Sequence, residues 1–480
     1  MEALDPENDG MLTSRPIIYK GLSERQVEVL KWSAEGKTAA EQQDSGRGQG
    51  SVERGVLAPR RSRAKRSVRR VEKHVKSPAL RARRHRDVRN ACRYADCALT
   101  TGIASPMPLL TTPFAELDLI RQPEQSDEPL QAFDAADEYL LNHVAEQGVT
   151  LQTRVLVLND SFGALAASLA PHAAVVSCTD SYLAVQALEK NLVRNGQAYD
   201  AVPVIAASAP LEGPFDWVLI RVPKTLALLE EQLIRLQGQL APGARVVAAG
   251  MIKHLPRSAG ELMEEYTGPV QASLAVKKAR LLICTPESKP FQASPYPTRY
   301  TLDEPRIELV NHANVFCRDG LDIGTRAFLP YLPKGLGTAR VADLGCGNGV
   351  LAIASALANP DAQYTLVDES FMAVQSAQEN WALALGERPA TIQAGDGLAA
   401  QEPDSLDVVL CNPPFHQQQV VGDFLAWRMF QQARSALVTG GALYIVGNRH
   451  LGYHSKLARL FRGVEQVAAT PKFVILKARK

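Results

Sequence analysis

The sequence predicts an α/β protein in which two tandem domains share one doubly wound, parallel-sheet design. Two observations support this prediction. Short apolar runs typical of strands alternate with longer helical patterns, as in strand–helix–strand units. The same series of motifs also occurs twice, because residues 154–170 (RVLVLNDSFGALAASLA) are similar to 340–356 (RVADLGCGNGVLAIASA), and residues 215–224 (FDWVLIRVPK) are similar to 406–415 (LDVVLCNPPF).

Composition excludes several protein classes. The 480 residues contain no apolar run long enough to span a membrane and no secretion signal, which predicts a cytoplasmic protein. The seven cysteines are widely spread without the paired spacing of metal ligands, so no metal site is expected. The net charge of +2 conceals an asymmetry, since the tract 53–93 carries 16 Lys or Arg and 3 acids while the rest is acidic.

The first 106 residues do not fit the pattern of the remainder. Residues 22–38 (LSERQVEVLKWSAEGKT) resemble the opening of a LuxR-type helix-turn-helix, but no recognition helix for a DNA groove follows. An Arg-rich tract comes next instead. Three interpretations stay open: an arm that binds RNA phosphates, a solvated tail without function, or an extension foreign to the working protein. The truncated motif favours the extension, with Met107 as the natural start.

The repeat divides the remainder into domains at 107–290 and 300–480, which are joined by the proline-rich segment 286–301. In the second copy, two apolar runs flank a turn at 470–472, which predicts an antiparallel hairpin at the sheet edge. A doubly wound sheet that ends in such a hairpin resembles the class I methyltransferase fold, a Rossmann-like fold.

A glycine loop follows the first strand of the second copy. It begins with Asp343 and contains Gly345, Cys346, Gly347 and Gly349 before an apolar helix. The glycines keep the turn tight and let a ligand approach backbone N–H groups. A leading acid favours S-adenosylmethionine, which carries an ammonium group, over a dinucleotide, whose pyrophosphate needs a helix N-terminus.

Two more acids end the next strands of the second copy. Asp368 closes the second strand, where a carboxylate can accept hydrogen bonds from both ribose hydroxyls of the cofactor. Asp396 closes the third strand, where we expect the adenine amine.

The tetrapeptide Asn412-Pro413-Pro414-Phe415 ends the fourth strand and predicts methyl transfer to an sp² nitrogen. The Asn412 oxygen can accept a hydrogen of a planar amine, the prolines restrict the loop, and Phe415 offers a face for stacking a base. Adenine N6, guanine N2 and a glutamine amide all fit this chemistry. His416 is adjacent, but transfer from a sulfonium needs no strong base, so a loop histidine is favoured over a catalytic one.

The first copy lacks the glycine loop, its leading acid and the NPPF motif. Val157 stands in place of Asp343, the loop reads 159–162 (NDSF), and 221–224 (RVPK) replaces the NPPF motif; Gly163 and an acid, Asp180, remain. With Phe162 in the loop, we expect no cofactor binding there. The retained domain predicts an RNA-binding role, with phosphate contacts or merely solvated charges at Arg221, Lys224, Lys277, Lys278 and Arg280.

A degenerate methyltransferase domain followed by an active domain with NPPF resembles the bacterial ribosomal RNA guanine-N2 methyltransferases, over about 107–480. Residues 311–333 (NHANVFCRDGLDIGTRAFLPYLP), NPPFHQQ, VPKTLALLEEQL, KKARLLICT and GNRHLGYHSKL resemble the large-subunit family, family G. The resemblance implies that Phe316, Asp322 and Gly324 close over the cofactor, S-adenosylmethionine. Cys317 departs from the family pattern, in which Ser is expected.

The resemblance also implies a substrate. The expected target is guanine 1835 of 23S ribosomal RNA, offered as protein-free or assembling RNA. The guanine is expected to be unstacked for the reaction, and the enzyme to be a monomer. Further phosphate contacts are expected on one C-terminal helix, at Arg449, His450, Lys456, Arg459 and Arg462. Three alternatives stay open: a small-subunit RNA guanine-N2 methyltransferase, a protein glutamine methyltransferase and, as a non-enzyme, a DNA-binding regulator.

Overall fold

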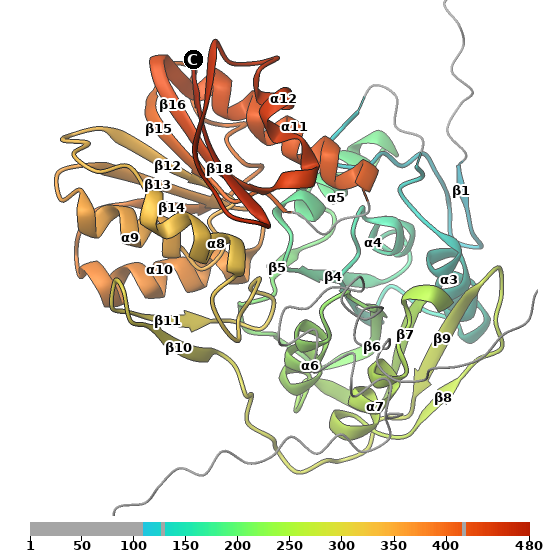
Figure 1. Cartoon of the computed structure of the whole chain (residues 1–480). Helices are drawn as coiled ribbons and strands as arrows, with labels where there is room; N and C mark the ends of the chain where they lie inside the picture. The colour runs from blue at the N-terminus through green and yellow to red at the C-terminus, as the bar shows by residue number, and fades with distance from the viewer. Residues whose placement is uncertain (1–108, 126–129, 415–418) are drawn as a thin grey trace, which may run out of the picture. The chain divides into compact units, whose positions relative to one another are not determined.

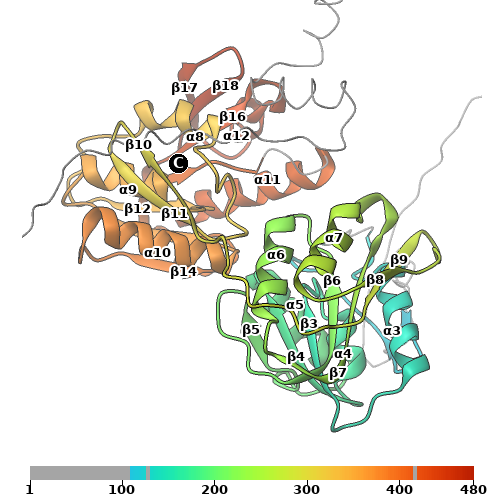
Figure 2. The same ribbon diagram turned by 90° about the horizontal axis from the view of Figure 1, so that it is seen from below.

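The computed structural model describes residues 109–125, 130–414 and 419–480, without the side chains of 419–423. In this part of the chain, two seven-stranded mixed sheets each carry helices on both faces (Figures 1 and 2). This arrangement confirms the predicted α/β fold with two Rossmann-like sheets. The helix-turn-helix fragment, the Arg-rich tract and Met107 lie outside the described residues.

The first sheet has the strand order β5-β4-β3-β6-β7-β9-β8, and with its helices it forms the first domain. Its strands are β3 (Arg154–Leu158), β4 (Ala174–Thr179), β5 (Val204–Ala206), β6 (Phe215–Arg221), β7 (Leu240–Met251), β8 (Val270–Ala272) and β9 (Ala279–Cys284). Its helices are α3 (Ala135–Gln147), α4 (Ala164–Leu169), α5 (Tyr182–Arg194), α6 (Leu226–Arg235), η1 (Ile252–His254) and α7 (Arg257–Tyr266). Five strands are parallel, and β9 and β8 complete the edge in antiparallel fashion.

The second sheet repeats this topology as β14-β13-β12-β15-β16-β18-β17 and defines the second domain. Its strands are β12 (Arg340–Leu344), β13 (Gln363–Asp368), β14 (Thr391–Ala394), β15 (Leu406–Cys411), β16 (Leu437–Asn448), β17 (Gly463–Ala469) and β18 (Phe473–Arg479). Its helices are α8 (Ile323–Phe328), η2 (Leu329–Tyr331), α9 (Val350–Ala358), α10 (Phe371–Leu385), α11 (Gln419–Ala436), η3 (Arg449–Leu451) and α12 (Tyr453–Leu457). The expected edge hairpin is present, with the last strand, β18, lying between β16 and β17.

Each sheet is buried on both faces, as a parallel sheet covered by helices must be. Along β3, Val155 and Val157 pack with α3, α4 and α5, whereas Leu156 and Leu158 pack with α6 and α7. In the second domain, α8, α9 and α10 cover one face, and α11 and α12 cover the other. The helices that follow the loops after β3 and β12, which are α4 and α9, are therefore fixed against their sheets.

The duplication extends to individual buried hydrogen bonds. Short hairpins precede the two sheets, β1 (Leu110–Thr111) with β2 (Glu116–Leu117), and β10 (Thr298–Leu302) with β11 (Ile307–Asn311). Asn191 of α5 bonds the backbone of Ile120 in both directions, at 2.9 Å each. Asn380 of α10 does the same with Val310, at 2.6 and 3.0 Å. Both side chains also donate to the loop after the central strand, so equivalent residues anchor both copies.

Two absences hold for the described residues. No helix in that part of the chain combines the length and hydropathy that a bilayer crossing requires. Within the same residues, no group of three or more His, Cys, Asp or Glu side chains is arranged to hold a metal ion.

Candidate active site

The glycine loop of the second domain leaves space for a ligand at its tip. Gly345, Gly347 and Gly349 have φ angles of 73°, 54° and 81°, which disfavour residues with a Cβ. A Cβ added to Gly347 would meet nothing within 4 Å, whereas one at Gly349 would press on Ala377 of α10. The N–H groups of Gly345 and Cys346 donate to the Val367 carbonyl at 2.9 and 3.1 Å, which ties the loop to β13.

Asp343 presents one unsatisfied oxygen beneath this loop. Its side chain is fully buried, and Oδ2 accepts the Ala352 N–H at 3.0 Å. Within the described part of the chain, Oδ1 has no hydrogen-bond partner, and burial raises the pKa of this carboxyl to about 7. A cationic ligand group would satisfy Oδ1 and favour the charged form. This buried acceptor suits the ammonium group of S-adenosylmethionine.

Asp368 holds the loop as well as closing β13. Oδ2 accepts the Gly347 N–H at 2.9 Å and Oδ1 accepts the Ser370 N–H at 3.0 Å, while burial raises the pKa of this acid. A carboxylate offers about four acceptor positions, so each oxygen keeps capacity for a further donor. Asp368 can therefore hold the loop and still bind two hydroxyl groups.

Asp396 has a partner that the sequence did not indicate. Both of its oxygens form an ion pair with the guanidinium of Arg428 from α11, and Gln432 donates to its backbone carbonyl at 3.0 Å. The expected contact with an adenine amine stays a prediction, and such an amine would have to share this carboxylate with Arg428.

Asn412 is held as an oriented acceptor at the end of β15. Its Nδ2 donates to Asp322 Oδ2 at 3.0 Å and to Thr325 Oγ1 at 2.9 Å. Its Oδ1 is enclosed and has no hydrogen-bond partner among the described residues. Because both amide hydrogens are used, the orientation of the amide is fixed and the remaining function is acceptance of a hydrogen bond. Pro413 and Pro414 follow directly, whereas Phe415 and His416 lie outside the described residues.

Two residues of the segment expected to close over the cofactor, Asp322 and Thr325, contact Asn412. Asp322 caps α8 by accepting the Thr325 N–H at 2.8 Å, and the same carboxylate oxygen receives the Asn412 amide. Gly324 is buried in this helix, whereas Phe316 is 57% exposed and Cys317 is exposed with a φ of 53°. Thr325 was missed by sequence reasoning, although the spacing of Asp322 and Thr325 is that of a helix cap.

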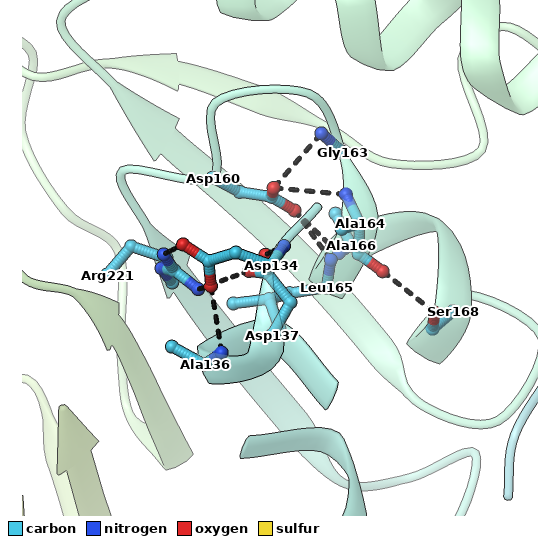
Figure 3. Close-up of polar contacts among 10 residues, drawn as sticks. All are labelled: Asp134, Ala136, Asp137, Asp160, Gly163, Ala164, Leu165, Ala166, Ser168 and Arg221. Carbon is cyan, nitrogen blue, oxygen red and sulfur yellow. Dashed lines mark hydrogen bonds and ion pairs between the residues drawn. The ribbon is translucent and has the colours of Figure 1, made fainter. Parts of the chain in front are cut away.

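In the first domain, a side chain of the protein itself bonds the backbone N–H groups after β3 (Figure 3). Asn159 adopts a φ of 63° where Gly345 stands in the second copy. The buried carboxylate of Asp160 accepts the N–H groups at the start of α4 at 2.9–3.0 Å, from Gly163, Ala164, Leu165 and Ala166. These donors are consequently unavailable to a ligand.

The sheet register shows that Asp180, the acid that remains in the first copy, is not the equivalent of Asp368. Leu158 pairs with Cys178, as Leu344 pairs with Val367, so Thr179 is the equivalent of Asp368. Asp180 corresponds to the following residue, Glu369. The first copy therefore has no acid at the positions of Asp343 and Asp368, where Val157 and Thr179 stand instead.

Arg221 was expected to contact phosphate, and the structure assigns it another role. Its side chain is 18% exposed and pairs with Asp134 at 2.9 Å and Asp137 at 2.7 Å (Figure 3). Asp134 also caps α3, and the neighbouring carboxylates raise the pKa of Arg221 against the effect of its burial. Arg221 is thus committed to a structural ion pair.

The other basic residues expected at phosphates differ in exposure. Lys224, Lys277, Lys278, Arg449 and His450 are exposed, and Lys277 pairs with Glu138 at 2.5 Å; Arg280 is partly buried.

The C-terminal basic residues do not share one helix, contrary to expectation. Arg449 and His450 belong to η3, Gly452 interrupts with a φ of 62°, and only Lys456 lies in α12. Arg459 and Arg462 come after that helix, so these charges do not form one helical face.

Two family models match this chain over successive segments. Residues 107–288 match the model of the RLMG N-terminal domain, and residues 306–477 match that of the methyltransferase small domain. Proteins named ribosomal RNA large subunit methyltransferase G are similar over 374 residues, or 78% of this chain and 100% of theirs. The identity is 84% for Pseudomonas savastanoi pv. phaseolicola, 82% for Pseudomonas fluorescens Pf0-1 and 77% for Pseudomonas putida W619.

One solved structure resembles most of the chain in fold. It is the T. thermophilus 16S rRNA N2 G1207 methyltransferase in complex with AdoMet and guanosine, at 20% identity. The superposition has a TM-score of 0.62 and covers 78% of this chain and 97% of that one.

Proposed function

Since the chain belongs to the ribosomal RNA large subunit methyltransferase G family, we propose that it methylates the N2 amine of a guanine in 23S ribosomal RNA, with S-adenosylmethionine as the methyl donor. The observation that carries the proposal is the Asn412 amide, whose two hydrogens are bound by Asp322 and Thr325 while its oxygen has no partner. Such a group accepts a hydrogen from an amine and leaves the amine lone pair available.

The chain also supplies the groups that would hold the cofactor. Asp343 offers its buried unpaired oxygen to an ammonium group, Gly347 leaves room at the loop, and Asp368 has acceptor capacity for ribose hydroxyls. When bound, the cofactor supplies a methyl group already activated by a sulfonium. Asn412 then aligns the amine with that methyl carbon, which makes alignment and electrostatics the main contributions of the protein. One N–C bond forms, the C–S bond breaks, and the amine loses a proton to solvent.

The finer assignments belong to this proposal. Phe415 would stack on the flipped base, and Asp396 would receive the adenine amine beside Arg428. Guanine 1835, the target implied by the family resemblance, is the first nucleotide to examine. The first domain would contact RNA through its exposed lysines, such as Lys224 and Lys278.

The test is transfer of labelled methyl groups to protein-free 23S RNA, 16S RNA or a peptide release factor, each offered separately. We expect label in 23S RNA alone and a fall of about a hundredfold or more in kcat for Asn412→Ala. Thr325→Val, which removes one partner of the amide, should lower kcat about tenfold.

A matched control is Asn142→Ala on the exposed face of α3, which should leave the rate unchanged. Label confined to 16S RNA would move the substrate to the small subunit. Label confined to the peptide would make the protein a glutamine methyltransferase. Full activity of Asn412→Ala would overturn the proposed role of the amide.

A further inference from the structure

The two domains meet through equivalent loops that exchange equivalent contacts. Ser181 and Ser370 are the N-caps of α5 and α10 and form an isolated antiparallel bridge with each other. Ser181 Oγ donates to Glu369 at 2.6 Å, and Ser370 Oγ donates to Asp180 at 2.6 Å. Because each element contacts its own counterpart, the contact has the reciprocal form of a two-fold interface.

The reciprocity is broken at Asp180 by one additional contact, which comes from Asn314. Its side chain is 5% exposed, and beyond Ser370 it accepts two further hydrogen bonds from the second domain. The Met372 N–H donates to Oδ1 at 2.8 Å, and Asn314 Nδ2 donates to Oδ2 at 2.7 Å. Glu369, its counterpart, is an exposed residue. The Asp180 half of the interface is therefore the more extensively bonded half.

Two partners of Asp180, Ser370 and Asn314, belong to segments that contain proposed cofactor-binding residues. Ser370 links Asp180 to Asp368, because its Oγ donates to Asp180 and its N–H donates to Asp368 Oδ1 at 3.0 Å. Asn314 stands two residues before Phe316, in the segment implied to close over the cofactor. One buried carboxylate thus joins the ribose-binding acid to the closing segment.

We propose that Asp180 of the first domain is a positioning residue for methyl transfer, which fixes Asp368 through Ser370 and the closing segment through Asn314. The degenerate domain then contributes to the active site without binding a cofactor itself. This inference rests on the proposed function, because it takes Asp368 as a ligand of S-adenosylmethionine.

The effect of Asp180 should be confined to the cofactor. Asp180→Asn keeps the shape of the side chain but replaces one acceptor oxygen with an NH₂ donor. This donor would face the donor group of Ser370, Asn314 or Met372, so at least one hydrogen bond would be lost. We expect the Kd of S-adenosylhomocysteine, measured by calorimetry on the full chain, and the KM for S-adenosylmethionine to rise about tenfold. The KM for 23S RNA and the kcat at saturating cofactor should change less than twofold.

Two further variants separate positioning from general weakening of the interface. Glu369→Gln alters the reciprocal contact with Ser181 and should leave cofactor affinity within about twofold. Asn314→Ala removes only the bond to the closing segment, so we expect a smaller rise in Kd than for Asp180→Asn.

The outcomes distinguish the two proposals. Unchanged Kd and KM for the cofactor in Asp180→Asn would overturn the positioning role, as would equal effects of Asp180→Asn and Glu369→Gln. If Asp180→Asn fails to fold, normal cofactor affinity of Asn314→Ala would likewise count against it. Failure of the unaltered protein to bind S-adenosylhomocysteine would instead contradict the proposed function.

Discussion

Asp343 and Asn412 each keep one enclosed side-chain oxygen without a hydrogen-bond partner. Leaving a buried acceptor unsatisfied costs about 1–3 kcal/mol, so such atoms call for an explanation in a folded protein. Both lie at the carboxyl ends of neighbouring parallel strands, β12 and β15, where ligands of α/β sheets bind. The two oxygens are accounted for together if a cation and an amine occupy this edge.

Asp343 should make stability depend on pH. Its pKa is raised from 3.8 to about 7 by burial, so between these values the folded state holds a proton that the unfolded chain has lost. The free energy of unfolding contributed by this group therefore falls as pH rises from about 4 to about 7. In urea unfolding without cofactor, Asp343→Asn should gain stability relative to the unaltered protein at pH 8 and not at pH 4.

The same substitution should abolish binding of S-adenosylhomocysteine, because a neutral amide cannot pair with an ammonium group. A stability difference between variant and unaltered protein that is equal at both pH values would contradict the shifted pKa of Asp343.

At the scale of elements, the same turn after the central strand is used in two ways. The loop of the second domain is opened by Gly347, whereas the first domain places the carboxylate of Asp160 against the start of α4. The helix N-terminus favours negative charge, so an internal carboxylate stabilises α4 without a ligand. In the first copy, the start of α4 is thus bonded by a side chain of the protein itself.

Asp160→Ala should test this interpretation. Four backbone N–H groups bond the buried carboxylate, and their loss should lower the free energy of unfolding by about 2 kcal/mol or more. Denaturant unfolding of the full chain measures it, with Asp200→Ala at an exposed turn as the control. Equal stability of the two variants would show that α4 does not depend on this cap.

At the scale of the whole molecule, the comparison with relatives and the Arg-rich tract lead to a prediction about the role of the first 106 residues. The relatives are covered completely by 374 residues of this chain, which is the length from Met107 to Lys480. We predict that a shortened chain beginning at Met107 retains kcat and KM for 23S RNA within about twofold.

Salt dependence provides the control for that prediction. A cationic arm on RNA would release counterions, so its removal would flatten the dependence of KM on salt concentration. A higher KM and a flatter salt dependence in the shortened chain would establish the Arg-rich tract as an RNA-binding arm.

Local patterns in the sequence determined the fold class, the duplication, the edge hairpin and the residues of the glycine loop and the NPPF motif. These features depend on periodicity and on neighbouring residues, because backbone conformation and strand order follow from short-range rules. The prediction that the C-terminal basic residues share one helix was wrong for an equally local reason. Gly452 adopts a left-handed conformation, which interrupts the helical path.

Only the tertiary structure decided which side chains meet. Asn412 and Thr325 are 87 positions apart, as are Arg221 and Asp134, and Ser370 lies 190 positions from Asp180. No spacing rule links such pairs, because their distance is set by how helices and loops pack on the sheets. Packing thus made Arg221 a structural residue, Thr325 a partner of the amide, and Asp180 a contact between the two copies.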